Sequence, residues 1–361
     1  MPKEPIIKLT HKEFLKADRD NEQAAHIYNL HYVKDSEPGI LRKKNGKTFK
    51  YFFEDRVLKE KKQLDRIKKL AIPPAWEKVW ICRMENGHIQ ATGIDSKNRK
   101  QYRYHKLWNA MRNETKFHHL YEFGKALPLL RTVIQKDILA KELVQQRVLA
   151  ILVSLMERTY IRIGNNEYEK MNGSYGLTTL KNKHVSITGD KIAFVFKGKK
   201  GIYHNITLKS KKLAKMVKAC RDIPGRELFQ YYDENGGKRP VDSGMVNNYI
   251  KDAMGSDFSA KDFRTWAGSL HALKAFRTLA DAETITEKKK NILEVLDKVS
   301  HELGNTRTVC KKYYVHPGVI QLYEEDKLTD YFKSPKGIKA DSEPTGLSSE
   351  EEILMDILKS S

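Results

Sequence analysis

Cysteine is scarce in this 361-residue chain, which contains only Cys82, Cys220 and Cys310. No two of them have the short spacing of a zinc site, and no other grouping of cysteine, histidine or carboxylate residues suggests a metal ion. An odd, scattered set of cysteines is typical of a reducing compartment rather than of secreted proteins held together by disulfides. We therefore expect an intracellular protein that needs no metal and no other cofactor.

Long apolar runs are also absent. No stretch approaches the ~20 residues that a helix needs to span a bilayer, and the N-terminal sequence MPKEPIIKLTHKEF lacks the apolar core of a signal peptide. The phosphate-binding P-loop is missing too, because the Gly-Lys pairs at Gly46 and Gly198 lack the upstream glycine that this loop requires. These absences argue against a membrane and against a nucleotide as partners.

Positive charge, by contrast, is abundant. The chain has 67 Lys and Arg residues against 46 Asp and Glu residues, a formal net charge of +21 and a pI of about 9.6. Such an excess indicates a polyanionic partner, of which nucleic acid is the first choice and an anionic membrane surface the second. The length allows two domains, because a single core rarely grows beyond roughly 250–300 residues.

The first third of the chain has a strand pattern. Residues 1–35 are polar with a short helical stretch near 11–18, and we expect an N-terminal extension there. Residues 36–112 are expected to form a small β-rich domain, in which Asn45-Gly46 marks the turn of a hairpin over Ile40–Phe53. The other elements expected in this domain are a charged helix over 55–70 and strands over 79–84, 88–95 and 100–105.

From about residue 113 the apolar residues recur at spacings of three and four, which indicates α-helices. Within this helical region, residues 184–208 alternate apolar and polar side chains around two glycine turns and predict a three-stranded meander, after which helices resume over 210–323. Residues 334–361 form an acidic tail that we expect to be disordered up to a short helix at 350–358. The predicted fold class is α+β: a small β-rich N-terminal module and a larger, mainly α-helical domain, 113–333, with an inserted three-stranded sheet. Two basic lobes on one chain favour a monomer that clamps a duplex.

Four separated segments hold residues suited to phosphate chemistry, although each is weak alone. Arg162 lies near the end of a long apolar helix, where an arginine is usually a surface residue, and the lysines of FKGKKG lie in a hairpin turn that is usually just solvated. Arg264 lies near the start of a helix whose apolar face would hold it at a fixed angle, as in a phosphate clamp or, about as often, a structural ion pair. The fourth segment, 300–317, breaks at Gly304-Asn305 and ends in adjacent tyrosines, in a chain whose 17 tyrosines must mostly be packing residues.

Taken together, the order and spacing of these segments resemble the poxvirus-like and bacterial type IB DNA topoisomerases. The shared order is an arginine, a lysine after a glycine in a hairpin, K-D-x-R-T, and G-[His/Asn]-T with a tyrosine nine residues after the His or Asn. YGLTTLKNKHV (Tyr175–Val185), IPPAW (Ile72–Trp76) and QATGIDSKNRKQYRYH (Gln90–His105) look like the family as well. The resemblance covers residues 40–332.

The resemblance implies an enzyme that relaxes supercoiled double-stranded DNA through a transient 3′-phosphotyrosyl bond, without ATP or a metal ion. Its catalytic domain would have the fold shared by these topoisomerases and the tyrosine recombinases. The implied catalytic residues are the nucleophile Tyr314, the phosphate-binding Arg162, Arg264 and Asn305, and the general acid Lys199. The implied DNA contacts are Gln101, Tyr102 and Tyr104 in the β-rich domain and Tyr168 in the helical one. Asn305 stands where poxviral members carry a histidine, which favours a bacterial protein. We expect this protein in the cytoplasm, associated with the nucleoid.

Two other functions are open at this point. A tyrosine recombinase shares the catalytic residue types, but recombinases usually place a histidine three residues before the second arginine, where this chain has Lys261. They also lack the module that contains Gln90–His105. A non-catalytic DNA-binding protein would explain the charge and the aromatic-basic strands. It would leave the spacing of the five implied catalytic residues unexplained, and it predicts no covalent protein–DNA adduct.

Overall fold

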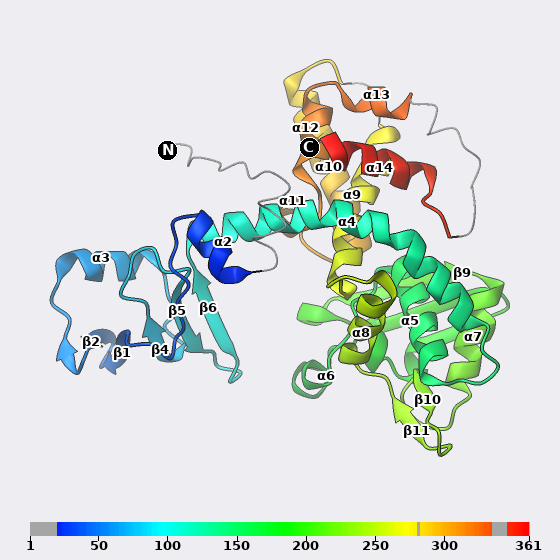
Figure 1. Cartoon of the computed structure of the whole chain (residues 1–361), viewed down its shortest axis with the longest axis horizontal. Coiled ribbons are helices and arrows are strands. Elements are labelled where there is room, and N and C mark those ends of the chain that lie inside the picture. Colours follow the sequence, from blue (N-terminus) through cyan, green and yellow to red (C-terminus); the bar gives the residue numbers. More distant parts are fainter. Residues whose placement is uncertain (1–19, 280–281, 334–344, 361) are drawn as a thin grey trace. The chain divides into compact units, whose positions relative to one another are not determined.

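The computed structural model describes residues 20–279, 282–333 and 345–360, without the side chains of 113–116. The chain forms two compact units, Met1–His118 and His119–Ser361 (Figure 1). Each unit has its own hydrophobic core. The boundary between them and the predicted boundary after residue 112 both fall within helix α4 (Lys106–Ile138). The helical part of the chain therefore begins earlier than the apolar spacing indicated.

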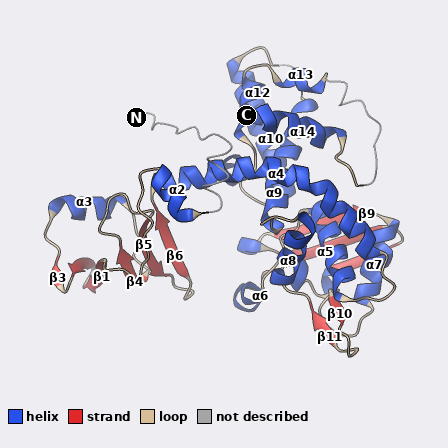
Figure 2. Ribbon diagram, in the orientation of Figure 1, coloured by secondary structure: helices blue, strands red, loops and turns tan. Residues whose placement is uncertain are grey.

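Unit 1 is built on a six-stranded antiparallel sheet with the order β3-β2-β1-β4-β5-β6 (Figure 2). Its strands are β1 (Ile40–Asn45), β2 (Thr48–Phe53), β3 (Arg56–Val57), β4 (Glu77–Ile81), β5 (Ile89–Ile94) and β6 (Lys100–Tyr104). The predicted hairpin and the three later strands are confirmed. Gly46 has a φ of 59° in the hairpin turn, a conformation that glycine adopts without strain. The helix predicted over 55–70 is shorter, because α3 (Lys61–Lys69) begins only after β3.

Helix α2 (Asn21–Ile27) lies in the segment that was expected to be an N-terminal extension. The Asp20 carboxylate caps its first turn by accepting two backbone N–H groups. Two fully buried alanines of α2 pack against Trp108 and Met111 of α4. From residue 20 onward this segment is therefore part of the core of unit 1, whereas the helical stretch expected near 11–18 lies outside the described residues.

Unit 2 is mainly helical, and α5 lies at its centre with residues 148–153 all buried. The helices described after α4 are α5 (Gln145–Thr159), α6 (Asn166–Asn172), α7 (Lys211–Arg221), α8 (Ser243–Met254), α9 (Ala260–Arg277), α10 (Ile285–Leu303), α11 (Arg307–Tyr313), α12 (Pro317–Glu324), α13 (Leu328–Phe332) and α14 (Ser349–Ser360). Helix α9 contacts α5 and α8 on one side and α10, α12 and α14 on the other. It therefore connects the two groups of helices that are visible in unit 2 (Figure 1).

The predicted meander is confirmed as a three-stranded antiparallel sheet, β7 (Val185–Thr188), β8 (Lys191–Lys197) and β9 (Tyr203–Lys209). Ile192, Phe194 and Phe196 alternate along β8 and are buried, which is the period-two pattern of a half-buried strand. A second, two-stranded sheet was not predicted. Its strands, β10 (Gln230–Tyr232) and β11 (Lys238–Pro240), lie within the stretch expected to be helical and are too short for alternation to show.

The terminal helix predicted at 350–358 is confirmed as α14, whereas the expectation of disorder is wrong for residues 345–349. The apolar face of α14 is buried in the core of unit 2. Its Glu351 side chain is only 5% exposed and accepts hydrogen bonds from Arg131 at 3.0 and 2.8 Å and from the indole Nε1 of Trp266 at 3.2 Å. The acidic composition gave no indication that the apolar face of this helix is buried. Residues 334–344 lie outside the described residues.

Candidate active site

Arg264 lies in the first turns of α9, and its side chain is only 5% exposed. Its Nη1 donates to the carbonyl oxygen of Tyr160 at 2.5 Å, and its Nη2 donates to that of Leu303 at 2.6 Å. Tyr160 ends α5 in a left-handed conformation, φ 53°, and Leu303 is the last residue of α10. Two carbonyl groups at the ends of distant helices therefore hold the guanidinium group in place.

Arg162 lies in the extended segment that follows α5, close to the first guanidinium group. Its Nη2 donates to Oδ1 of Asn305 at 2.6 Å and to the carbonyl oxygen of Gly304 at 3.4 Å. Burial, together with the positive charge of Arg264, lowers the pKa of Arg162 to about 10, against the opposing influence of Tyr314. Arg162 therefore still carries its charge at neutral pH, at a position where that charge is costly.

Neither guanidinium group forms an ion pair with a carboxylate among the described residues. The Nε of Arg264 is buried and has no hydrogen-bond partner there. Buried charges in proteins are normally paired, because an unpaired charge loses its hydration without compensation. A buried arginine and a partly buried neighbour, with no carboxylate partner among the described residues, therefore form a site for an anion that comes from outside the chain.

Tyr314 lies at the C-terminal end of α11, beside these arginines. Its ring centroid is 5.3 Å from the Arg264 guanidinium carbon, and its side chain lies near enough to Arg162 to raise the pKa of that arginine against the effect of burial. Its backbone is seated on α9: the Ser269 hydroxyl donates to the Tyr314 carbonyl oxygen at 3.2 Å, and a Cβ built on Gly268 would lie 2.5 Å from that oxygen. The adjacent Tyr313 is 39% exposed instead.

Asn305 lies in the sharp turn between α10 and α11, as the sequence predicted. Gly304 caps α10 with a φ of 56°, and Thr306 caps α11 through its side chain. The Asn305 Oδ1 accepts the hydrogen bond from Arg162, and its Nδ2 donates to the Leu303 carbonyl oxygen at 3.2 Å. One N–H of the amide thus remains for a further acceptor near the two arginines.

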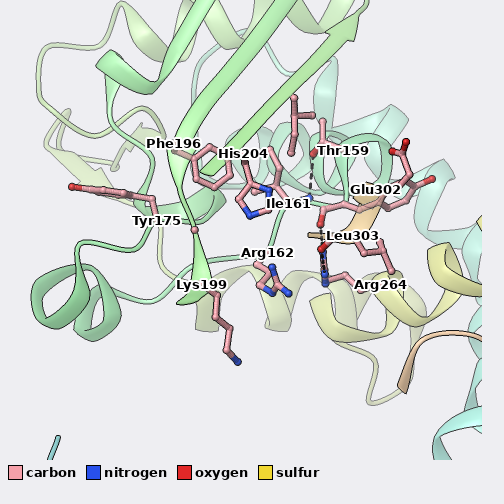
Figure 3. A pocket seen from close by; sticks show the side chains of 13 residues that line it. Thr159, Ile161, Arg162, Tyr175, Phe196, Lys199, His204, Arg264, Glu302 and Leu303 are labelled. Carbon is pink, nitrogen blue, oxygen red and sulfur yellow. Dashed lines mark hydrogen bonds between the residues drawn. The ribbon is translucent and has the colours of Figure 1, made fainter. Parts of the chain in front are cut away.

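Lys199 lies in the β8–β9 connection, in a short 3-10 turn over Lys199–Gly201. Lys200 in this turn has a φ of 63°, and Gly201 a φ of 79°. The Lys199 side chain is exposed and reaches away from the strands (Figure 3). Unlike the arginines and Tyr314, its ammonium group makes no hydrogen bond or ion pair with any described residue.

A small pocket lies where these segments meet, and Figure 3 shows Arg162, Arg264 and Lys199 around it. His204 of β9 also lines it and was not among the predicted residues. Burial, with the charges of Arg162 and Arg264, lowers the pKa of His204, so its imidazole is neutral at neutral pH. No motif pointed to this histidine, because it alternates with exposed residues along an ordinary strand.

The predicted DNA contacts fall into separate places. Tyr102 and Tyr104 are exposed on β6 of unit 1, and their rings stack with centroids 5.7 Å apart. Gln101 precedes Tyr102 on the same strand and so points to the opposite face, where its Nε2 donates to Asp95 at 2.9 Å. Tyr168 is 44% exposed on α6 of unit 2.

The described residues include no group of three or more histidine, cysteine, aspartate or glutamate side chains that could hold a metal ion. Among the same residues, no helix has the length and apolar character to cross a membrane.

Two family models match the chain. The model described as "Eukaryotic DNA topoisomerase I, catalytic core" matches residues 97–340, and the model described as "Bacterial DNA topoisomerase IB, N-terminal domain" matches residues 48–95. The chain is 36% identical over 299 residues to DNA topoisomerase 1B of Acanthamoeba polyphaga mimivirus, which covers 80% of this chain and 88% of the viral protein. It is 26% identical over 240 residues to DNA topoisomerase I of Monkeypox virus and to DNA topoisomerase 1B of Vaccinia virus (strain Copenhagen), which covers 66% of this chain and 73% of each relative.

Proposed function

This chain belongs to the type IB DNA topoisomerase family and is a type I topoisomerase that acts on DNA, and from this premise we propose that it relaxes supercoiled duplexes through a 3′-phosphotyrosyl bond to Tyr314. The observation that carries the proposal is the pair of neighbouring arginines, Arg264 buried and Arg162 partly buried, that have no carboxylate partner among the described residues and lie beside Tyr314. A DNA phosphate supplies the missing negative charge, and the tyrosine lies beside it.

In the proposed reaction, the Tyr314 oxygen forms a bond to phosphorus and the bond from phosphorus to the 5′-oxygen breaks. The phenolic proton is released, and the 5′-oxygen takes up a proton as it leaves. The transition state carries extra negative charge on the non-bridging oxygens. Arg162 and Arg264 stabilise that charge with charge-assisted hydrogen bonds, and the remaining N–H of Asn305 supplements them.

Lys199 is proposed as the general acid that protonates the leaving 5′-oxygen. Its support is its place on the pocket rim and its lack of any hydrogen-bonded or ion-pair partner among the described residues. An ammonium group without a fixed partner is able to approach a bound strand. In religation the same residue accepts the proton, and the 5′-hydroxyl displaces Tyr314. Because the phosphotyrosyl bond keeps the energy of the broken bond, the proposed cycle needs neither ATP nor a metal ion.

The proposal for DNA binding follows the predicted aromatic and polar residues. Tyr102, Tyr104 and Tyr168 present exposed rings to the duplex, and Gln101, which is partly buried on the opposite face of β6, contacts a base or the backbone from there. We propose a monomer that clamps the DNA, with no nucleotide as partner, in the cytoplasm and associated with the nucleoid. The bacterial source stays a prediction, since one matched family model is bacterial whereas the relatives named above are viral.

The test is relaxation of a supercoiled plasmid in EDTA without ATP, read on an agarose gel. The native protein is expected to relax the plasmid and Tyr314→Phe to be inactive. Tyr313→Phe is the matched control, because it removes the same hydroxyl group from the exposed neighbour, and it should relax the plasmid normally. A plasmid that is bound but not relaxed by the native protein would contradict the proposal and favour a binding protein. Exchange of strands between two DNA partners would favour a recombinase.

A further inference from the structure

His204 connects two parts of the site that are far apart in the sequence. It lies on β9 directly opposite Phe196 of β8, and the two rings stack with centroids 5.1 Å apart and an interplanar angle of 22°. Figure 3 shows the imidazole reaching from the strand toward Arg162. It therefore lies between the hairpin that bears Lys199 and the helix-connecting turn that bears Asn305.

Two glycines show how closely the imidazole fits there. A Cβ built on Gly198 would lie 2.6 Å from Cδ2 and Nε2 of His204, and a Cβ built on Gly304 would lie 2.4 Å from its Cε1. Gly198 directly precedes Lys199, and Gly304 directly precedes Asn305. The His204 imidazole is thus packed against the backbone of Gly198 and of Gly304, the residues that directly precede the two proposed catalytic side chains.

The ring is held by packing rather than by polar contacts. No hydrogen bond joins either imidazole nitrogen to a described residue. A planar side chain that is stacked on one face and enclosed by two backbones at its edge acts as a spacer, because close-packed atoms transmit a displacement to their neighbours.

We propose that His204 is a positioning residue, whose imidazole sets the distance between the Lys199 hairpin and the Asn305 turn and so places the Lys199 ammonium group at the leaving 5′-oxygen. This inference rests on the proposed function, in which Lys199 is the general acid. Removal of the imidazole lets the hairpin move relative to the arginines, and proton delivery to the 5′-oxygen becomes slow while phosphate binding persists.

The experiment is single-turnover cleavage of two DNA duplexes that differ in one atom. One has an ordinary scissile phosphodiester, and the other has sulfur in place of the bridging 5′-oxygen. A thiolate leaves without a proton, so the sulfur duplex does not need the general acid. His204→Ala should cleave the oxygen duplex roughly 10- to 100-fold more slowly than the native protein, as expected for a misplacement of about 1 Å. It should cleave the sulfur duplex within about threefold of the native rate.

Lys199→Ala is the reference, and it should show the same selective recovery with sulfur. The double variant of His204 and Lys199 should cleave the oxygen duplex no more slowly than Lys199→Ala alone, because both changes act on one step. Asn205→Ala, which changes the next residue of β9 at an exposed position, should be unaffected. His204→Phe keeps a ring on Phe196 and should retain more activity than His204→Ala, with an unchanged melting temperature.

Equal slowing of His204→Ala on both duplexes, or losses that add with Lys199→Ala, would show a general structural role and overturn the inference. So would cleavage of the oxygen duplex at the native rate. If Lys199→Ala itself shows no recovery with sulfur, the proposed role of Lys199 fails. A selective recovery seen only for Lys199→Ala leaves the proposed function standing and refutes the role of His204.

Discussion

The close approach of α9 to the nucleophile predicts that Gly268→Ala impairs cleavage more than it impairs folding. A Cβ on Gly268 would lie 2.5 Å from the carbonyl oxygen of Tyr314, 2.7 Å from its Cβ and 2.8 Å from its carbonyl carbon. Carbon atoms in contact are normally about 3.5–4.0 Å apart. The backbone of Tyr314 must therefore move by about 1 Å, because the added Cβ would meet mainly backbone atoms, which cannot move aside by a change of rotamer.

The cost in stability should be moderate. Overpacking typically costs about 1–3 kcal/mol, and replacement of a helix-interior glycine by alanine returns up to about 1 kcal/mol. The net loss of about 0–2 kcal/mol lowers the melting temperature by at most roughly 8 °C for a unit of this size. The cleavage rate should fall by about 100-fold, because a displacement of about 1 Å at a reacting group has that effect.

The assay is single-turnover cleavage of a duplex at a temperature well below melting, together with thermal unfolding. Gly244→Ala is the matched control, since Gly244 also lies inside a helix, α8, and a Cβ there would meet only the Asp242 side chain, at 3.1 Å. The control should cleave at the native rate and melt at the same temperature or higher. Native cleavage by a folded Gly268→Ala protein would refute the argument that contact with α9 seats Tyr314.

Three further predictions follow from the same structure. Arg264→Ala should reduce the cleavage rate by about 10²–10³-fold, the usual effect of removing one donor to a transition-state oxyanion, as measured by covalent adduct formation. Glu351→Ala should lower the free energy of unfolding by about 3 kcal/mol in urea titrations, because the partly buried Arg131 loses two hydrogen bonds. Burial lowers the pKa of His271 below the ordinary 6.5, so the unfolded chain binds a proton at this histidine more readily than the folded chain does. The free energy of unfolding should therefore decrease as the pH falls below about 6.5. This decrease should be smaller in His271→Gln.

Matched control substitutions for the first two of these predictions are available in the same protein. Arg277→Ala removes a more exposed arginine from the other end of α9 and should leave cleavage unchanged, so an equal loss there would contradict the role given to Arg264. Glu352→Ala removes the neighbouring carboxylate of α14 and should change stability by less than about 0.5 kcal/mol. A pH dependence that is the same with and without His271 would contradict the last prediction.

Much of the fold follows from local patterns that the sequence displays openly. The hairpin at Asn45-Gly46, the meander over 184–208 and the break at Gly304 were all predicted correctly. Each depends on a turn residue with a special backbone conformation or on alternation along one strand, and both are properties of neighbouring residues. The α+β class and the family were likewise confirmed, since five short motifs in one order are specific even though each is weak alone.

Other features could not be read in this way. Residues 20–35 were expected to be a polar extension and α14 a helix at the end of a disordered tail, yet the alanines of α2 and the apolar face of α14 are buried in the cores. The overall composition of a segment does not reveal that one face of its helix is apolar. Whether that face is buried depends on a distant part of the chain that packs against it. The strands β10 and β11 were missed for a related reason, because three residues are too few to show a period.

The sequence alone thus showed the types of residue needed for phosphate chemistry and their order along the chain. The arrangement that turns them into a site was decided only by tertiary packing. The Arg264 guanidinium group is held by the carbonyls of Tyr160 and Leu303, Tyr314 is seated on Gly268, and His204 fits between two glycines. A sequence does not show which group a backbone carbonyl or a glycine contacts. Every residue has a carbonyl, and a glycine shows only that no side chain occupies its position. Which group fills that space is determined when helices and strands distant along the chain pack together.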